Sequence, residues 1–275
     1  MSTEMSTDEL RARHLSGTAA AGLTNAAHSL RAAMELIDAA DQDLDRIGGA
    51  AGALNEHALR LAFAGDQESR WQRLNAAREN AAALDDRLLR TQRTLAGGSD
   101  VSAADHLRQG AAGIEVAEHA LRELQGIEGH DALATAVLAE RASVLRTALN
   151  GSREAIGGAD MRIKSARASL AVLTRSDSLR SDQDSPYLAT QVSSIGTEAA
   201  RDIGRARSEV TRTDGRLDTT RAAAESSARE SADLAARAGL NPTPPSQQRH
   251  VASTGDQTLR QRMDGNQRDP GRGRD

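Results

Sequence analysis

The stretch that decides the fold runs from Leu23 to Leu61 and reads LTNAAHSLRAAMELIDAADQDLDRIGGAAGALNEHALRL. Apolar residues recur in it at intervals of seven, and a second apolar residue follows each of them after three positions. This spacing is typical of a helix whose apolar seam packs lengthwise against another helix. The first set is Leu23, Leu30, Ile37, Leu44, Ala51 and Ala58, and the second is Ala26, Ala33, Ala40, Ile47, Leu54 and Leu61.

The segment 67–96 repeats this pattern and predicts a second helix. Gly65 and Asp66 supply the turn between the two helices. If Gly65 is the hinge, an antiparallel hairpin places opposite one another residues whose numbers sum to about 131. The predicted packing seam of this hairpin is Leu23, Leu30, Ile37, Leu44, Ile47, Leu54, Leu61, Leu74, Leu84, Leu88 and Leu95.

Glycines interrupt the first helix, which we expect over residues 8–64. An interior glycine costs a helix roughly 1 kcal/mol relative to alanine. The pair Gly48-Gly49 therefore leaves two alternatives open, one continuous helix or a helix that kinks or breaks at this point.

The rest of the chain predicts three more helices, over about 102–127, 131–174 and 186–240. Gly97, Gly98, Ser99 and Asp100 form a turn before the first of them, so that 8–96 and 102–174 are two hairpins of one bundle spanning 1–175. The segment 176–185 is polar and is interpreted as a linker. The last helix has a seam diluted by Thr and Ser, so we expect its second half to be loosely held.

The final stretch, 241–275, consists largely of Pro, Gly, Gln and Arg with few apolar residues, and is predicted to be disordered. The fold predicted for the whole chain is therefore all-α. We expect an elongated, antiparallel, up-and-down helical bundle of about five long helices with a disordered C-terminal tail.

Composition restricts the classes of function. The 275 residues include one Phe, one Trp, one Tyr and no Cys, so the core is aliphatic, and thiolate chemistry and disulfides are excluded. A net charge of -4 argues against a dominant attraction to nucleic acid or an acidic membrane. The polar, partly acidic opening of the chain predicts a cytoplasmic protein.

The choice of basic residue is unusual, because Lys164 is the only lysine among 35 lysine and arginine residues. Together with the abundance of Ala and Gly, this indicates the codon bias of a high-GC genome. The composition resembles that of the Ala/Arg-rich, coiled-coil-like helical proteins encoded by high-GC bacteria. The resemblance is compositional, and it transfers no residue roles.

Glu115 and His119, four residues apart on one predicted helix, are the strongest candidate for a metal site. Both lie away from the predicted seam, and the Glu-x-x-His motif of bundle di-iron sites is absent. A solvent-exposed helix face is the favoured interpretation. We accordingly predict no metal site, no cofactor and no catalytic residues.

Phe63 and Trp71 flank the predicted turn at Gly65. The favoured interpretation is that they plug the end of the first hairpin. A helical hairpin with a tryptophan beside its turn also resembles the small substrates of type VII secretion. The chain departs from that family because Gln72 and Arg73 follow Trp71 in place of a Trp-x-Gly motif, and because Gln191 stands four residues after Tyr187, where the export signal has an acid.

These patterns favour a non-catalytic helical scaffold or protein–protein interaction module. The expected partner is another protein or a second copy, bound through helix faces, with no small-molecule substrate, nucleic acid or membrane. Self-association is suggested because the last helix and the first part of helix one lack an obvious partner of equal length. The alternatives are an exported helical effector or type VII-like secretion substrate or partner, and a hydrophilic stress-protection protein.

Overall fold

The computed structural model describes residues 6–98, 101–127, 131–175 and 179–237, and none of these residues lies in a strand. The predicted all-α fold is confirmed, with five long helices over this part of the chain. The third helix ends three residues before the expected residue 127, and the expected end of the last helix near 240 and the predicted tail 241–275 lie outside the described residues. The helices are α1 (Thr7–Ala62), α2 (Gln67–Ala96), α3 (Ala103–Leu124), α4 (Ala132–Arg175) and α5 (Ser185–Arg237).

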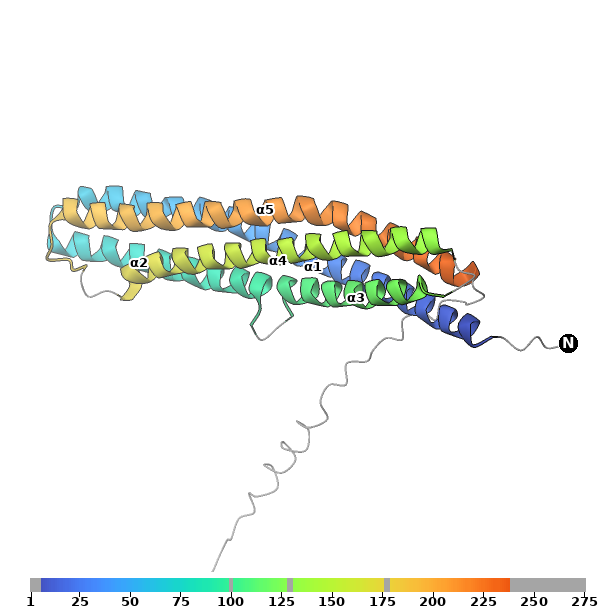
Figure 1. Cartoon of the computed structure of the whole chain (residues 1–275). Coiled ribbons are helices and arrows are strands. Elements are labelled where there is room, and N and C mark those ends of the chain that lie inside the picture. Colours follow the sequence, from blue (N-terminus) through green and yellow to red (C-terminus); the bar gives the residue numbers. More distant parts are fainter. Residues whose placement is uncertain (1–5, 99–100, 128–130, 176–178, 238–275) are drawn as a thin grey trace, which may run out of the picture. The chain divides into compact units, whose positions relative to one another are not determined.

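The five helices form four rods that lie side by side. There are four because α2 and α3 lie end to end, run in the same direction and together make one rod (Figure 1). The predicted hairpins 8–96 and 102–174 are both present, but the up-and-down order does not hold at the connection between α2 and α3. Arg73 of α2 donates a hydrogen bond to the carbonyl of Arg60, and Arg11 pairs at 3.3 Å with Glu123 of α3. The residue numbers of these two contacting pairs sum to 133 and 134. α3 therefore lies along α1 in the same antiparallel register as α2.

The α2–α3 rod and α5 both pack lengthwise against α1, and the same two rods pack against α4. Contacts along α1 and α5 confirm an antiparallel pair: Arg31 lies 3.1 Å from Glu225, and Ser193 donates to Asn55 at 3.3 Å. The last helix and the start of helix one, for which the sequence suggested no partner, therefore cover each other. The reason given for self-association through these seams does not hold.

The predicted packing seam forms the core of the bundle. Each of its eleven residues is at most 2% exposed, and α1 is helical without interruption through Gly48 and Gly49. Seam residues on both sides of this glycine pair, among them Ile47 and Leu54, are buried against neighbouring rods. Tertiary burial of these side chains compensates for the weak helix propensity of the glycines.

Two other glycines allow α1 and α3 to approach closely. A Cβ atom built on Gly22 would lie 2.5 Å from the carbonyl oxygen of Gly113, and one built on Gly113 would lie 2.7 Å from the carbonyl oxygen of Gly22. Neither helix accommodates a methyl group at this crossing. A Cβ atom built on Gly49, by contrast, would meet no heavy atom of a neighbouring element within 4 Å.

We predict that Gly22→Ala destabilises the bundle by about 1–3 kcal/mol, because the two backbones must separate. The matched substitution Gly49→Ala is expected to stabilise it by roughly 1 kcal/mol, because alanine is the better helix former and meets no neighbour. Urea unfolding followed by circular dichroism measures both free energies. Equal effects of the two substitutions would contradict the close α1–α3 contact.

The core is less apolar along the second half of α5. The buried positions of its first half include Leu188, Val192, Ile203 and Val210, whereas those of its second half are mostly small or hydroxyl-bearing. After Val210 these positions are Thr213, Leu217, Thr220, Ala224, Ser227, Ser231 and Ala235.

We expect the amides of α5 from 220 to 235 to exchange with deuterium faster than those from 188 to 210. The reason is that local opening exposes less apolar surface in the second half and so costs less free energy. Native-state hydrogen exchange read by mass spectrometry measures the difference. Uniform protection along α5 is the outcome that contradicts the expectation.

Candidate interaction surface

The chain's three aromatic residues lie at one end of the bundle, where α1 ends and α2 and α5 begin (Figure 1). Phe63 caps α1, Trp71 lies in the second turn of α2, and Tyr187 lies in the first turn of α5. Their exposed fractions are 84%, 52% and 47%, and nearby Leu59 is 63% exposed. We call Leu59, Phe63, Trp71 and Tyr187 the aromatic end.

This exposure corrects the prediction that Phe63 and Trp71 plug the hairpin. Smaller groups close this end of the core: Ala64 and Leu179 are each 4% exposed. The hydroxyl of Ser185 donates to the carbonyl of Ala64 at 2.6 Å, which ties the start of α5 to the turn. These smaller groups fill this end of the core, and the rings remain in solvent.

Arginines of α2 fix the surface around these rings. Arg70 donates from Nε to the carbonyl of Ser181 at 3.0 Å, and Arg78 donates to the carbonyls of Leu173 and Leu179 at 3.3 and 2.8 Å. The part of the predicted linker that the structure describes is therefore held against α2. A surface fixed in this way loses little conformational entropy when it binds a partner.

Two adjoining hollows accompany the aromatic end. One, of about 600 Å³, is lined among others by Phe63, Arg70, Asp184 and Tyr187. The other, of about 650 Å³, lies between α1 and α5 beside Leu59, and Ala62 lines both. Apolar, aromatic and charged groups thus meet on a hollowed surface.

The candidate metal pair, Glu115 and His119, lies on α3. His119 lies 2.9 Å from Glu123, and its side chain is 77% exposed. Within the described parts of the chain, no group of three or more His, Asp or Glu side chains is arranged to hold a metal ion.

Sequence reasoning missed the buried carboxylate of Glu118, whose side chain is 2% exposed. Glu118 pairs with Arg146 of α4 at 3.2 Å and also with Arg122. The available signal was that Glu118 directly follows Ala117, a buried residue of α3, but Arg146 comes from another helix. Both ion pairs offset part of the cost of burying the charge, and the pair with Arg146 connects α3 to α4.

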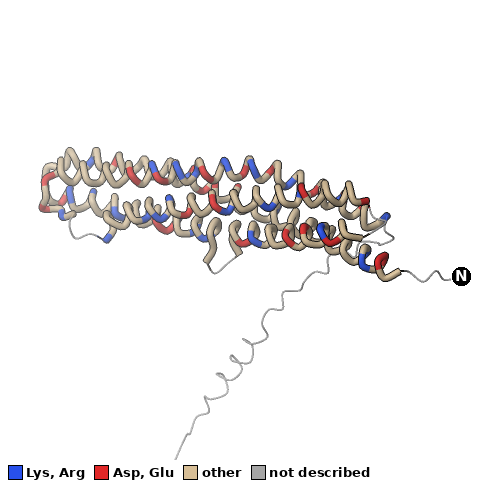
Figure 2. The backbone as a smooth tube through the Cα atoms, in the orientation of Figure 1, with Lys and Arg blue, Asp and Glu red and all other residues tan. Residues whose placement is uncertain are grey.

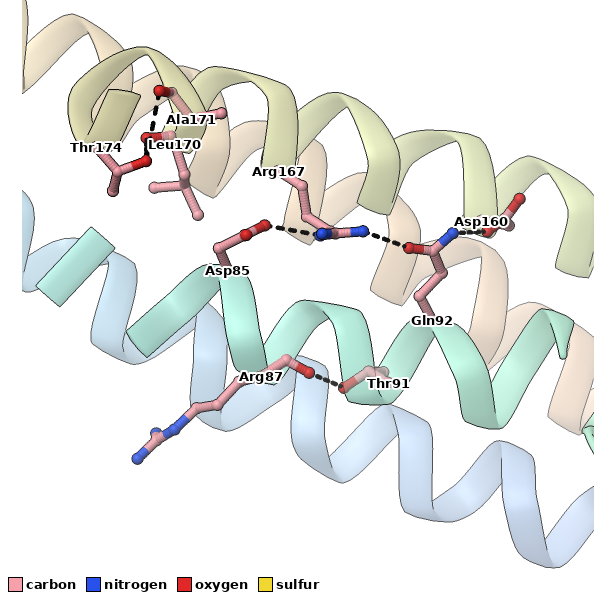
Figure 3. A network of polar contacts seen from close by, with 9 residues as sticks. All are labelled: Asp85, Arg87, Thr91, Gln92, Asp160, Arg167, Leu170, Ala171 and Thr174. Atoms are coloured by element: carbon pink, nitrogen blue, oxygen red, sulfur yellow. Dashed lines mark hydrogen bonds and ion pairs between the residues drawn. The ribbon is translucent and has the colours of Figure 1, made fainter. Parts of the chain in front are cut away.

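A second polar network links α2 to α4 (Figure 3). Arg167 donates to Asp85 at 2.7 Å and to the side-chain oxygen of Gln92 at 3.0 Å. Gln92 in turn donates to Asp160 at 2.8 Å, and Asp160 pairs with Lys164 at 2.6 Å. Since the amide and both carboxylates are hydrogen-bonded or paired, the network holds the register of the two helices rather than presenting a reactive group.

Carboxylates from α1 and α5 gather near the middle of the bundle. Burial, followed by the charges of Asp38, Asp218 and Asp41, raises the pKa of Asp214. One oxygen of Asp214 is buried and has no hydrogen-bond partner among the described residues. Arg207 partly balances the cluster through its ion pairs with Asp41, at 3.5 Å, and with Asp45.

We predict that Asp214→Asn stabilises the protein at pH 7 by up to about 1 kcal/mol, since solvent screens part of the repulsion. A raised folded-state pKa means that ionisation opposes folding. The penalty is therefore full above the folded pKa and disappears as the pH falls below the unfolded value. The advantage of the variant should shrink between neutral pH and about pH 4.

Thermal unfolding across this pH range measures the effect. Asp45→Asn is the matched control, because Asp45 pairs with Arg207 and its removal should leave stability unchanged or lower it. A gain from Asp214→Asn that is the same at every pH would contradict the assignment.

No helix within the described residues combines the length and the apolar character needed to cross a membrane. Comparisons of the chain with family models, curated proteins and solved structures find no match. The class of the protein is therefore defined by its fold, an all-helical bundle, and its most distinctive surface is the aromatic end.

Proposed function

We propose that the protein is a non-catalytic protein–protein interaction module, with the bundle as scaffold and the aromatic end as its contact surface. The observation that carries the proposal is that the only Phe, Trp and Tyr in 275 residues are all exposed at one end of the bundle. Aromatic side chains usually contribute to protein cores. At interfaces Trp, Tyr and Arg supply a large share of the binding energy.

The remaining surface supports the scaffold role. Acidic and basic residues alternate along the helices and are interspersed over the bundle (Figure 2). Many form ion pairs between neighbouring rods, as Arg141 does with Glu230 and Arg167 does with Asp85. These pairs align the rods and keep the aromatic end on a rigid support. We keep the cytoplasm as the proposed location, which rests on the sequence pattern alone.

Site-specific photo-crosslinking in cells that express the protein tests the proposal. The crosslinking residue p-benzoylphenylalanine replaces Phe63 or Trp71 in two variants and Val144 in a third. Val144 is 64% exposed on α4 and serves as the matched control. We expect specific adducts larger than the 29.0 kDa chain from positions 63 and 71, and none from position 144.

Absence of adducts from both end positions would refute the proposed contact surface. The same set of adducts from all three positions would also refute it, because it would indicate nonspecific collisions. Circular dichroism of the purified variants checks that each bundle is folded.

A further inference from the structure

We propose that a hollow between α1 and α2 binds a phosphoryl group, either as the free phosphate ion or as part of a small phosphorylated molecule. The hollow has a volume of about 240 Å³ and is lined by Asp43, Arg46, Ile47, Arg87 and Arg90. We call it the arginine hollow, because it places three guanidinium groups beside one carboxylate. Arg87 lies roughly 24 Å along α2 from Trp71, so the proposal is independent of the aromatic end.

Two of these arginines face each other across the contact between α1 and α2. Arg46 and Arg87 line the hollow from opposite helices, and their residue numbers sum to 133, as do those of the contacting pair Arg60 and Arg73. At other points neighbouring rods pair unlike charges. Like charges that face each other oppose packing, so this arrangement by itself lowers the stability of the bundle.

The positive charge of the arginine hollow is not balanced within the described part of the chain. There the guanidinium groups of Arg87 and Arg90 have no ion-pair or hydrogen-bond partner. Figure 3 shows the side chain of Arg87 extending away from the network between α2 and α4, and its one dashed line joins its main-chain carbonyl to Thr91. Asp43 pairs with Arg46 at 3.5 Å. One carboxylate against three guanidinium groups leaves a net charge of +2.

A phosphoryl group matches this hollow in charge and in geometry. Near neutral pH a phosphomonoester carries about two negative charges, whereas a carboxylate carries one and would leave half of the excess unbalanced. The planar fork of N–H donors on a guanidinium group fits phosphate oxygens. Three such oxygens can accept from arginines on both helices at once. Ile47, which is 2% exposed, gives the hollow an apolar wall, and limited contact with water strengthens the attraction.

Calorimetric titration of the full chain at constant ionic strength tests the proposal. The probes are inorganic phosphate, the phosphomonoester phenyl phosphate, and acetate as the matched anion with a single charge. We expect both phosphate compounds to bind in saturable fashion and acetate not to bind at the same concentrations. Tighter binding of the ester would identify a phosphorylated molecule as the ligand, whereas equal binding of the two would show that the free ion provides the whole interaction.

Three variants separate the arginine hollow from the charge of the bundle as a whole. Arg87→Gln with Arg90→Gln should weaken phosphate binding by roughly tenfold or more, yet leave the ligand-free bundle at least as stable, because it removes a repulsion. Asp43→Asn should strengthen phosphate binding, because it removes the competing carboxylate. The control, Arg212→Gln with Arg216→Gln, removes the same charge from exposed positions of α5 and should bind phosphate like the unaltered chain. Circular dichroism and urea unfolding without phosphate measure folding and stability.

Absence of phosphate binding overturns the proposal, and so does equal binding of acetate and phosphate. An equal loss of binding in the α5 control would also overturn it, because net charge alone would then explain the effect. A ligand-free bundle that is destabilised by the substitutions at Arg87 and Arg90 would contradict the argument from repulsion. None of these substitutions alters the aromatic end, so the crosslinking test of the proposed function stands or fails separately.

Discussion

Burial of the apolar seam of α1 is the interaction on which the other elements depend. α1 contacts α2 along its second half, α3 along its first half, and α5 along almost its whole length. Each leucine or isoleucine removed from water contributes on the order of 2 kcal/mol, so a continuous seam outweighs the poor helix propensity of Gly48 and Gly49. The helix breaks where the seam ends, at Ala62, and not where the glycines occur.

Polar contacts determine which register the seams adopt. Heptad seams alone permit shifts by seven residues, since each shift again places apolar residues opposite one another. The network of Asp85, Gln92, Arg167 and Asp160 favours one alignment of α2 with α4. Glu118 does the same for α3 and α4 through Arg146. The carboxylates around Asp214 have the opposite effect, because they place like charges between α1 and α5.

The aromatic end differs from the rest of the molecule in what its side chains contact. Elsewhere large apolar residues pack inside the bundle or are scattered along its surface. At this end three rings and Leu59 remain in solvent on a surface held by hydrogen bonds from Arg70 and Arg78. Because these rings are 47–84% exposed, they bury less apolar surface in the bundle than the seam residues do, which supports the proposed role in binding.

The sequence by itself determined the helices, their apolar seams and the aliphatic core, because a seven-residue repeat is a local pattern that allows only one type of structure. Only the tertiary structure decided that α3 continues the direction of α2. Gly97 and Gly98 mark where α2 ends. The direction of α3 depends on the apolar surface of the first half of α1, against which α3 packs. The exposure of Phe63 and Trp71 was equally undetermined, because it depends on Leu179 and Ser185, which come from later segments and fill the end of the core beside Ala64.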